Sequence, residues 1–316
     1  MPRRRKGRRI DGWLVVDKPK GVGSTDVVSK ARWALQAQKA GHAGTLDPLA
    51  TGVLAIAFGE ATKTVPYAQE GAKTYRFTVR WGSATNTDDA EGEVIATAAA
   101  RPSAAEIEAA LPDFVGVVMQ RPPAFSAIKV DGARAYDLAR EGAAPELAPR
   151  PIRIDALRLI ETPRAEEAVL EMVCGKGGYV RAVARDLGER LGCFGHVTAL
   201  RRLTSGPFTL DEAISFEMLD RLRDTSPSDL RIAPVAAGLD DIPALTVDGG
   251  TAAMIRNGQA APVIGALAGQ DLSYGDAVWA SHDGAPVAVG VYRAGSFHPT
   301  RVFAPPAAGA ERPGFS

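Results

Sequence analysis

The sequence predicts an α+β protein: a mostly antiparallel mixed sheet flanked by helices, followed by a small C-terminal β-rich domain. Strand-like runs and helix-like stripes are mixed without the strict alternation that a parallel βαβ sheet requires. Residues 75–81 alternate between apolar and polar side chains, as in a half-buried antiparallel strand. Beyond a linker at 239–243, short strands recur at close spacing, which is typical of a partly closed barrel. A chain of 316 residues suits one large and one small domain.

The first elements are a short strand at 14–16 and a helix that carries Val27, Ala31 and Leu35 on one face. Ser24 or Thr25 is expected to cap this helix. The glycine-rich turn between the two elements lacks the spacing of a Walker motif, so nucleotide binding is not predicted.

The next segment, Gly41-His42-Ala43-Gly44-Thr45-Leu46-Asp47-Pro48-Leu49-Ala50-Thr51-Gly52, holds one carboxylate in a tight loop. Gly41, Gly44 and Gly52 permit positive φ angles and close backbone approach, and Pro48 restricts Asp47 to extended conformations. The apolar run 53–58 that follows predicts a buried strand. An acid on a rigid loop beside a buried strand is a candidate nucleophile or base, and the alternative is an Asx turn in which Asp47 caps its own backbone.

The middle of the chain continues with a short helix near 61–69 and the alternating strand at 75–81. The acidic run 87–92 is expected to be a solvated hairpin loop, and Ser103 with Glu106 predicts a capping box. Residues 125–130, a turn at 131–132 and a helix over 134–140 form a predicted insertion. Its basic and aromatic residues suit a mobile loop that grips RNA, and the alternative is a surface hairpin packed on the sheet.

The remaining elements are strands at 152–159, 169–174 and 196–203, and a helix with a core stripe from Val180 to Leu191. A short helix at 251–256 follows the linker, and strands are expected at 261–264, 277–280, 287–292 and 300–303.

Composition excludes several classes of protein. No run approaches the ~18 apolar residues of a membrane span, no apolar segment of a secretory signal follows the basic N-terminus, and two cysteines, Cys174 and Cys193, are expected to be buried thiols in a cytoplasmic protein. The net charge is zero, but residues 3–9 carry six Arg and Lys side chains. This arm suits contact with nucleic-acid phosphates, and the alternative is a solvated tail.

The Asp47 segment resembles the catalytic motif of the bacterial tRNA pseudouridine synthase B family, which isomerises uridine 55 in the TΨC arm of tRNA. Five other segments resemble the family in the same order: 17–21, 73–75, 122–129, 176–181 and 196–202. The resemblance is clear over about residues 11–216.

The resemblance implies a pseudouridine synthase fold and a domain division. Residues 1–10 would be a basic arm, 11–240 the catalytic domain with a thumb-like insertion at about 124–151, 244–305 a PUA-like RNA-binding domain, and 306–316 a disordered tail. The run 255–259 carries the resemblance in the C-terminal domain. The implied substrate is the T-arm stem-loop of tRNA, the implied enzyme is a cytoplasmic monomer without a membrane segment, and neither a cofactor nor a metal is expected.

The resemblance also assigns roles to residues. The implied catalytic residues are Asp47, Tyr75, which would stack on the uracil of a flipped-out nucleotide, and Arg181, which would pair with Asp47. The implied substrate-binding residues are His42, which fills the gap left by the flipped nucleotide, with Tyr179, Leu200 and Lys18 near the pocket.

Without the resemblance, these residues also fit purely structural roles. Tyr75 fits a core aromatic on its strand, Leu200 fits any core leucine, and Arg181 fits a surface helix residue. Two other functions also remain: an RNA-binding protein that does not catalyse, and a hydrolase with an Asp nucleophile. The hydrolase needs a second carboxylate, for which Asp88 and Asp89 are the candidates.

Overall fold

The computed structural model describes residues 7–126, 129–130, 133–134, 147–224, 232–263 and 271–305. The predicted arm up to residue 6, most of the predicted insertion and the predicted tail lie outside these residues. Part of the arm is described, and it is not a free tail. The amide of Arg8 donates to Gln36 (2.7 Å), and Arg9 pairs with Asp11 (2.8 Å) and donates to the Pro305 carbonyl (2.7 Å).

The larger domain is built on a ten-stranded mixed sheet in the described part of the chain, in the order β14-β1-β3-β12-β4-β11-β10-β7, with β13 beside β12 and β2 beside β3. Only the β1–β14 and β3–β12 pairs within this sheet are parallel, so the predicted mostly antiparallel arrangement is confirmed. The strands are β1 (Gly12–Lys18), β2 (Ala40–His42), β3 (Thr51–Phe58), β4 (Lys73–Trp81), β7 (Gly116–Gln120), β10 (Arg150–Arg164), β11 (Glu167–Cys174), β12 (Gly195–Ser205), β13 (Phe208–Thr209) and β14 (Ile214–Ser215).

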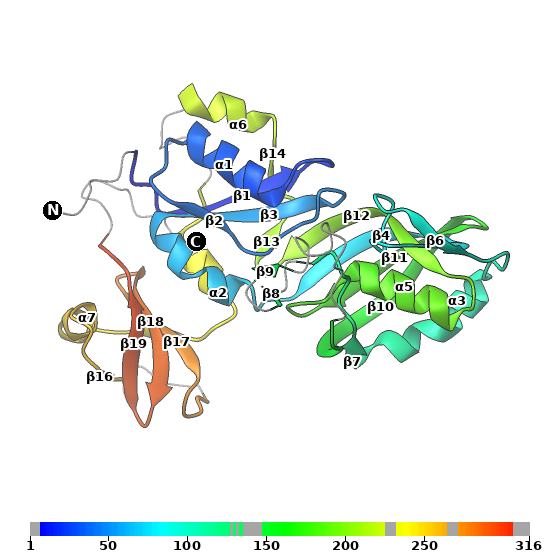
Figure 1. Ribbon diagram of the computed structural model, residues 1–316. Coiled ribbons are helices and arrows are strands. Elements are labelled where there is room, and N and C mark those ends of the chain that lie inside the picture. Colours follow the sequence, from blue (N-terminus) through cyan, green and yellow to red (C-terminus); the bar gives the residue numbers. More distant parts are fainter. Residues whose placement is uncertain are drawn as a thin grey trace.

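Helices cover the sheet in two groups (Figure 1). Helices α1 and α6 lie over the half that contains β1, and α3 and α5 lie over the half that contains β4 and β10. The helices are α1 (Ser24–Ala34), α2 (Val65–Ala68), α3 (Ala104–Ala110), α5 (Val180–Arg190), α6 (Met218–Arg221) and α7 (Gly249–Arg256), with 3-10 turns η1 (Gly59–Lys63), η2 (Leu111–Phe114), η3 (Leu222–Asp224) and η5 (Val235–Leu239).

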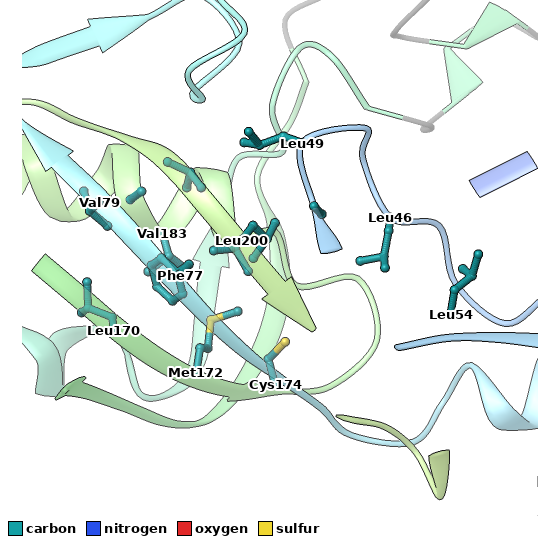
Figure 2. Packing of buried hydrophobic residues seen from close by; sticks show 14 of the residues in the cluster. Leu46, Leu49, Leu54, Phe77, Val79, Leu170, Met172, Cys174, Val183 and Leu200 are labelled. Carbon is teal, nitrogen blue, oxygen red and sulfur yellow. The ribbon is translucent and has the colours of Figure 1, made fainter. Parts of the chain in front are cut away.

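The two halves of the sheet meet where β3 runs parallel to β12. That pairing is short, with Arg201 opposite Thr51 and Arg202 opposite Gly52. The core of the second half forms around β4, where Phe77 and Val79 face Val183 of α5 and Leu200 of β12 (Figure 2). The seam between the halves is therefore the place where the loop before β3, the end of β12 and the start of α5 come together.

Local signals in the sequence account for several elements. The predicted capping box is present, because the Ser103 hydroxyl accepts from the Glu106 amide and the Glu106 carboxylate accepts from the Ser103 amide. The cysteines are buried thiols as predicted. The predicted helix over 134–140 is wrong at its start, since Arg134 belongs to the hairpin of β8 (Lys129–Val130) and β9 (Ala133–Arg134), and its other residues lie outside the described part.

The C-terminal domain is a five-stranded sheet in the described residues, in the order β15-β17-β18-β19-β16. Helix α7 packs on it, and the Asp248 carboxylate caps that helix through the Thr251 amide (2.7 Å). The β-rich domain is confirmed, and its PUA-like character stays a prediction. Its strands are β15 (Ala244–Thr246), β16 (Ala261–Pro262), β17 (Ala277–His282), β18 (Ala285–Arg293) and β19 (Ser296–Val302). A further hairpin, in the larger domain, comprises β5 (Ser83–Thr85) and β6 (Val94–Thr97).

The two domains touch through a small apolar cluster and a polar clamp. Leu239, Val289 and Phe303 form the cluster. In the clamp, Lys63 donates to the Val302 carbonyl (2.8 Å) and Glu60 accepts from the Ala304 amide (2.7 Å). No helix within the described residues has the length and apolar character needed to cross a membrane.

Candidate active site

The Asp47 loop, residues 43–50, leads into β3 at the seam of the sheet. Gly44 and Gly52 have φ angles of +104° and +100°, as the glycine pattern predicts, whereas Gly41 lies in β2 without a positive φ. A Cβ atom on Gly52 would lie 2.1 Å from the carbonyl oxygen of Arg202. Glycine is therefore required at position 52, because β12 passes directly over it.

Contacts on both sides of Asp47 fix the loop in the core. Leu46 and Leu49 are buried in the cluster that also contains Leu200 (Figure 2). The Ser24 hydroxyl donates to the Leu46 carbonyl (2.7 Å) and accepts from the Leu46 amide (2.8 Å). The predicted capping by Ser24 or Thr25 is thus wrong: Gly23 is the N-cap of α1 and makes no side-chain cap, and Ser24 holds the Asp47 loop instead.

Arg181, in the first turn of α5, supplies the cationic partner of Asp47. Its Nη2 lies 2.9 Å from Asp47 Oδ2, with the arginine side chain 5% exposed and the aspartate 39% exposed. The same guanidinium donates to the carbonyls of Thr87 (2.9 Å) and Phe125 (2.8 Å). Arg181 is therefore a buried residue, not a surface one. Its guanidinium pairs with the Asp47 carboxylate and orients it.

The acidic turn after β5 is the second partner of the arginines on α5. Asp89 Oδ2 lies 3.6 Å from Arg181 Nη1, and Asp88 Oδ2 lies 2.9 Å from Arg185 Nη1. Asp89 also accepts from the Thr87 hydroxyl (2.6 Å) and the Glu91 amide (3.0 Å). The predicted solvated loop is therefore wrong. The turn packs against β12 and α5, where its two carboxylates pair with the buried Arg181 and the partly buried Arg185.

Asp88→Asn tests this turn by its effect on stability. Burial raises the pKa of Asp88 from 3.8 to about 6, although Arg185 and Arg181 oppose the shift. Because the folded state holds this proton where the unfolded state has lost it, wild-type stability falls as the pH rises from about 4 to about 6. The Asn variant lacks this loss, and Asn tolerates the φ of 60° at this position.

Urea unfolding of both proteins between pH 4 and pH 7 measures the effect. The free energy of unfolding of the variant, relative to wild type, should increase across this range by up to about 3 kcal/mol. A difference that does not change with pH would contradict the burial of a proton-holding carboxyl at position 88.

Tyr75 lies on the inward face of β4. It is partly buried, packs against the main core and is the cross-strand neighbour of Arg202. Burial raises the pKa of Tyr75, and the charge of Arg202 and a hydrogen bond with it act in the opposite direction. Leu200, 8% exposed, packs in the same core, and its carbonyl accepts from the Thr51 hydroxyl (3.3 Å). Tyr75 and Leu200 thus pack in the same core as Leu46 and Leu49, which flank Asp47 in the chain.

Tyr179 is fixed by a residue that the sequence did not single out. It is the N-cap residue of α5 and lacks a side-chain cap, and the Gln120 amide group bonds its backbone twice: to the Tyr179 amide (2.9 Å) and to its carbonyl (3.1 Å). Burial raises the pKa of the Tyr179 phenol, and the charge of Asp47 adds to this. Tyr179 thus lies at the start of α5, two residues before Arg181, whose guanidinium pairs with Asp47.

Lys18 and His42 complete the predicted set. Lys18 is fully buried and its ammonium donates to the carbonyls of Pro19 (2.9 Å), Val22 (2.7 Å) and Pro48 (3.3 Å), so it ties two loops together. Burial lowers the pKa of Lys18 to about 8, against the raising effect of Asp47 and Glu91. Burial, with a smaller contribution from Arg202, also lowers the pKa of His42, whose Nδ1 has no hydrogen-bond partner among the described residues.

Arg202 is a further residue that holds the Asp47 loop, and the sequence assigned it no role. Its Nε donates to the Val53 carbonyl (2.8 Å) and its Nη2 to the Gly44 carbonyl (3.1 Å). A signal was present, because two successive arginines on one strand must face opposite sides of the sheet. Arg201 faces outward to Asp17 (2.8 Å), so Arg202 has to face inward.

In the assembled site, the partly exposed Asp47 carboxylate pairs with the Arg181 guanidinium, and Tyr75 and Leu200 pack in the core that holds the Asp47 loop. Such a site suits a planar base that stacks on a ring while an acid works on the attached sugar. The described residues contain no group of three or more side chains able to hold a metal ion. Asp89 sits on the same Arg181 guanidinium as Asp47 but is buried and hydrogen-bonded, which leaves it poorly suited to serve as the second acid of a hydrolase.

Family models match most of the larger domain. Residues 32–180 match the N-terminal domain of the TruB family pseudouridylate synthases, and residues 181–239 match the tRNA pseudouridylate synthase B C-terminal domain.

Curated relatives are similar over nearly the whole chain. A tRNA pseudouridine synthase B of Cereibacter sphaeroides is 58% identical and the match covers 96% of this chain and 99% of that protein. Those of Dinoroseobacter shibae and Brucella melitensis are 56% and 46% identical, over 96% and 95% of this chain and 98% of each relative.

Solved structures share the fold. The archaeal box H/ACA sRNP Nop10–Cbf5 complex matches with a TM-score of 0.71 at 21% identity, over 93% of this chain and 86% of that chain. An H/ACA RNP bound to a substrate RNA containing 2'-deoxyuridine matches with a TM-score of 0.72 at 20% identity, over 96% and 92%.

Proposed function

This chain belongs to the TruB family of pseudouridylate synthases, and we propose that it converts uridine 55 in the TΨC loop of tRNA to pseudouridine with Asp47 as the essential carboxylate. The observation that carries the proposal is the 2.9 Å pair between Asp47 and the buried Arg181 at a half-open site. The reaction is inferred from the names of the relatives, and the Asp47–Arg181 pair is suited to it. The enzyme is an isomerase that acts on RNA, and we propose that it works as a monomer in the cytoplasm.

The reaction breaks the C1′–N1 bond of uridine and forms a C1′–C5 bond in the same nucleotide. N1 gains a proton and C5 loses one, so atoms and oxidation state balance without a second substrate. The base lies inside the folded T-arm and has to flip out to reach Asp47. We propose that Tyr75 stacks on the flipped uracil, that Leu200, Tyr179 and Lys18 line or support the pocket, and that His42 fills the space that the nucleotide leaves.

Three features of the site support these roles. Arg181 keeps a positive charge next to Asp47, so the carboxylate has its partner before RNA binds. The buried leucines at positions 46 and 49 and the hydroxyl of Ser24 hold the backbone of the loop in one place. The carboxylate itself keeps its open side toward solvent, which gives a flipped nucleotide access.

Incubation with an unmodified tRNA transcript, followed by mapping of pseudouridine, tests the function. We expect one new pseudouridine at position 55, the same product with an isolated T-arm stem-loop, and none with a transcript in which uridine 55 is replaced by cytidine. Binding without product would favour the RNA-binding alternative. Product at other positions only would refute the T-arm assignment.

Tyr75→Phe and Tyr75→Leu separate two roles of the ring. Stacking on a base contributes ~1–3 kcal/mol and survives in Phe, whereas a phenol that relays the C5 proton is lost in both variants. We expect both to be slower than wild type and Leu to be the slower, because a misplaced base costs as much as ~100-fold in rate. Tritium release from 5-tritiated uridine in tRNA measures the rates.

Melting temperatures provide the control for Tyr75, since its strand neighbours Phe77 and Val79 belong to the core. The comparison is valid where the two variants melt together. Wild-type turnover by the Leu variant would make Tyr75 a plain core residue and remove it from the site.

A further inference from the structure

Arg202 is a buried cation without an acidic partner in the described part of the chain. It exposes 1% of its surface, and its guanidinium donates to two backbone carbonyls, those of Val53 and Gly44. A buried charge that no acid neutralises is costly to hold in a fold. The neighbouring Arg201, by contrast, is 40% exposed and forms a two-pronged pair with Asp17 (2.8 and 3.0 Å).

The two carbonyls that Arg202 holds bracket the Asp47 loop. Gly44 stands before Asp47, and Val53 is the third residue of β3 after it. One planar guanidinium therefore bonds both ends of the loop: its Nη2 donates to the Gly44 carbonyl (3.1 Å) and its Nε to the Val53 carbonyl (2.8 Å). The backbone of Arg202 adds a third restraint, because its register partner Gly52 has no room for a side chain beneath the Arg202 carbonyl.

The same residue reaches the aromatic wall. Arg202 and Tyr75 are register partners on β12 and β4, and both face inward. Burial raises the pKa of the Tyr75 phenol, and the charge of the neighbouring Arg202 guanidinium acts in the opposite direction. Arg202 thus contacts the loop that carries the acid and the ring that is proposed to hold the base, whereas Arg181 contacts the carboxylate itself.

We propose that Arg202 is a positioning residue for the isomerisation: its buried guanidinium clasps both ends of the Asp47 loop and the Tyr75 ring, so that the acid and the ring meet the flipped uridine in one fixed geometry. The inference rests on the proposed function of Asp47. A small displacement of a reacting group costs about 100-fold in rate, so loosening this clasp slows the chemical step. Binding of tRNA is unaffected, because Arg202 is covered by protein.

Arg202→Met, Arg202→Lys and the matched control Arg201→Met test the inference. The measurements are the Kd for an unmodified tRNA transcript, the melting temperature, and the rate constant of tritium release in a single turnover with saturating enzyme. We expect Arg202→Met to bind tRNA like wild type and to react about 100-fold more slowly. Arg202→Lys should recover part of the rate, because it keeps the charge and one donor, and Arg201→Met should keep the wild-type rate constant.

A wild-type rate constant in Arg202→Met would overturn the inference, as would an equal loss in Arg201→Met. If Arg202→Met does not fold, Arg202→Lys decides: a wild-type rate constant overturns the inference and a slow one supports it. A purely structural role would lower the melting temperature and the reacting fraction but leave the rate constant unchanged. Asp47→Asn, measured in parallel, separates the two proposals: if it reacts like wild type, the proposed function fails, and if it is inactive while Arg202→Met is fast, only the positioning role fails.

Discussion

Asp47→Asn is expected to bind tRNA with the wild-type Kd and to lose turnover by about 10⁴-fold, the upper range for removal of a positioned acid–base group. Asn preserves the shape of the side chain, and its amide oxygen can still accept from Arg181, which lies 2.9 Å from the carboxylate. The charge needed to attack the nucleotide or to remove a proton is gone. Single-turnover tritium release from 5-tritiated uridine in tRNA gives the rate, and filter binding gives the Kd.

A matched aspartate provides the control for that experiment. Asp113 is 56% exposed and pairs with Arg190 at the surface (3.1 Å), so Asp113→Asn removes a carboxylate from an ion pair without touching the site. It should react like wild type. Near-normal release by Asp47→Asn would remove Asp47 from the chemistry, and a shared loss in both variants would point to the tRNA or the assay instead.

Arg181→Lys is expected to slow the reaction by about 100-fold even though the charge is kept. The guanidinium contacts Asp47, Asp89 and the carbonyls of Thr87 and Phe125 at once. The Lys side chain is shorter and ends in a compact ammonium, which cannot reach all four partners. Breaking a buried pair of this kind also costs stability, about 3–5 kcal/mol when one partner is removed outright. We therefore expect a lower melting temperature together with a slow single turnover at saturating enzyme.

Arg185→Lys is the control for Arg181→Lys, because Arg185 lies one turn further along α5 and pairs with Asp88 and Asp186 rather than Asp47. It should lose stability and keep the rate constant of the folded enzyme. If Arg181→Lys keeps the wild-type rate constant, Arg181 does not orient Asp47. If Arg185→Lys is as slow as Arg181→Lys, the loss belongs to the helix as a whole.

Elements with a strong local signal were predictable from the sequence. The alternation in β4, the core stripe of α5 and the capping box of α3 each depend on spacing within about a dozen residues, and all three are present. The position of Asp47 in a glycine loop before a buried strand was also visible, since the glycines, Pro48 and the apolar run are contiguous.

The partners of the site residues were not predictable in the same way. Taken alone, Arg181 looked like an exposed helix residue, because the Thr87 carbonyl that it binds is 94 residues away, and only the family resemblance predicted its pairing with Asp47. The acidic turn looked solvated for the same reason. Ser24 was predicted to cap a helix from its position in the sequence. Its hydroxyl instead bonds the Leu46 amide and carbonyl, which supply a donor and an acceptor inside the core.

The short parallel contact between β3 and β12 also determines when the enzyme becomes competent during its synthesis. Its two register pairs, and the Arg202 bonds that reach across 149 residues to Val53, form only after β12 has emerged from the ribosome. Until then the Asp47 loop lacks the two hydrogen bonds from the Arg202 guanidinium, although Arg181 on α5 is made before β12. A chain that ends before β12 therefore contains Asp47 but lacks the β3–β12 pairing that holds the end of its loop.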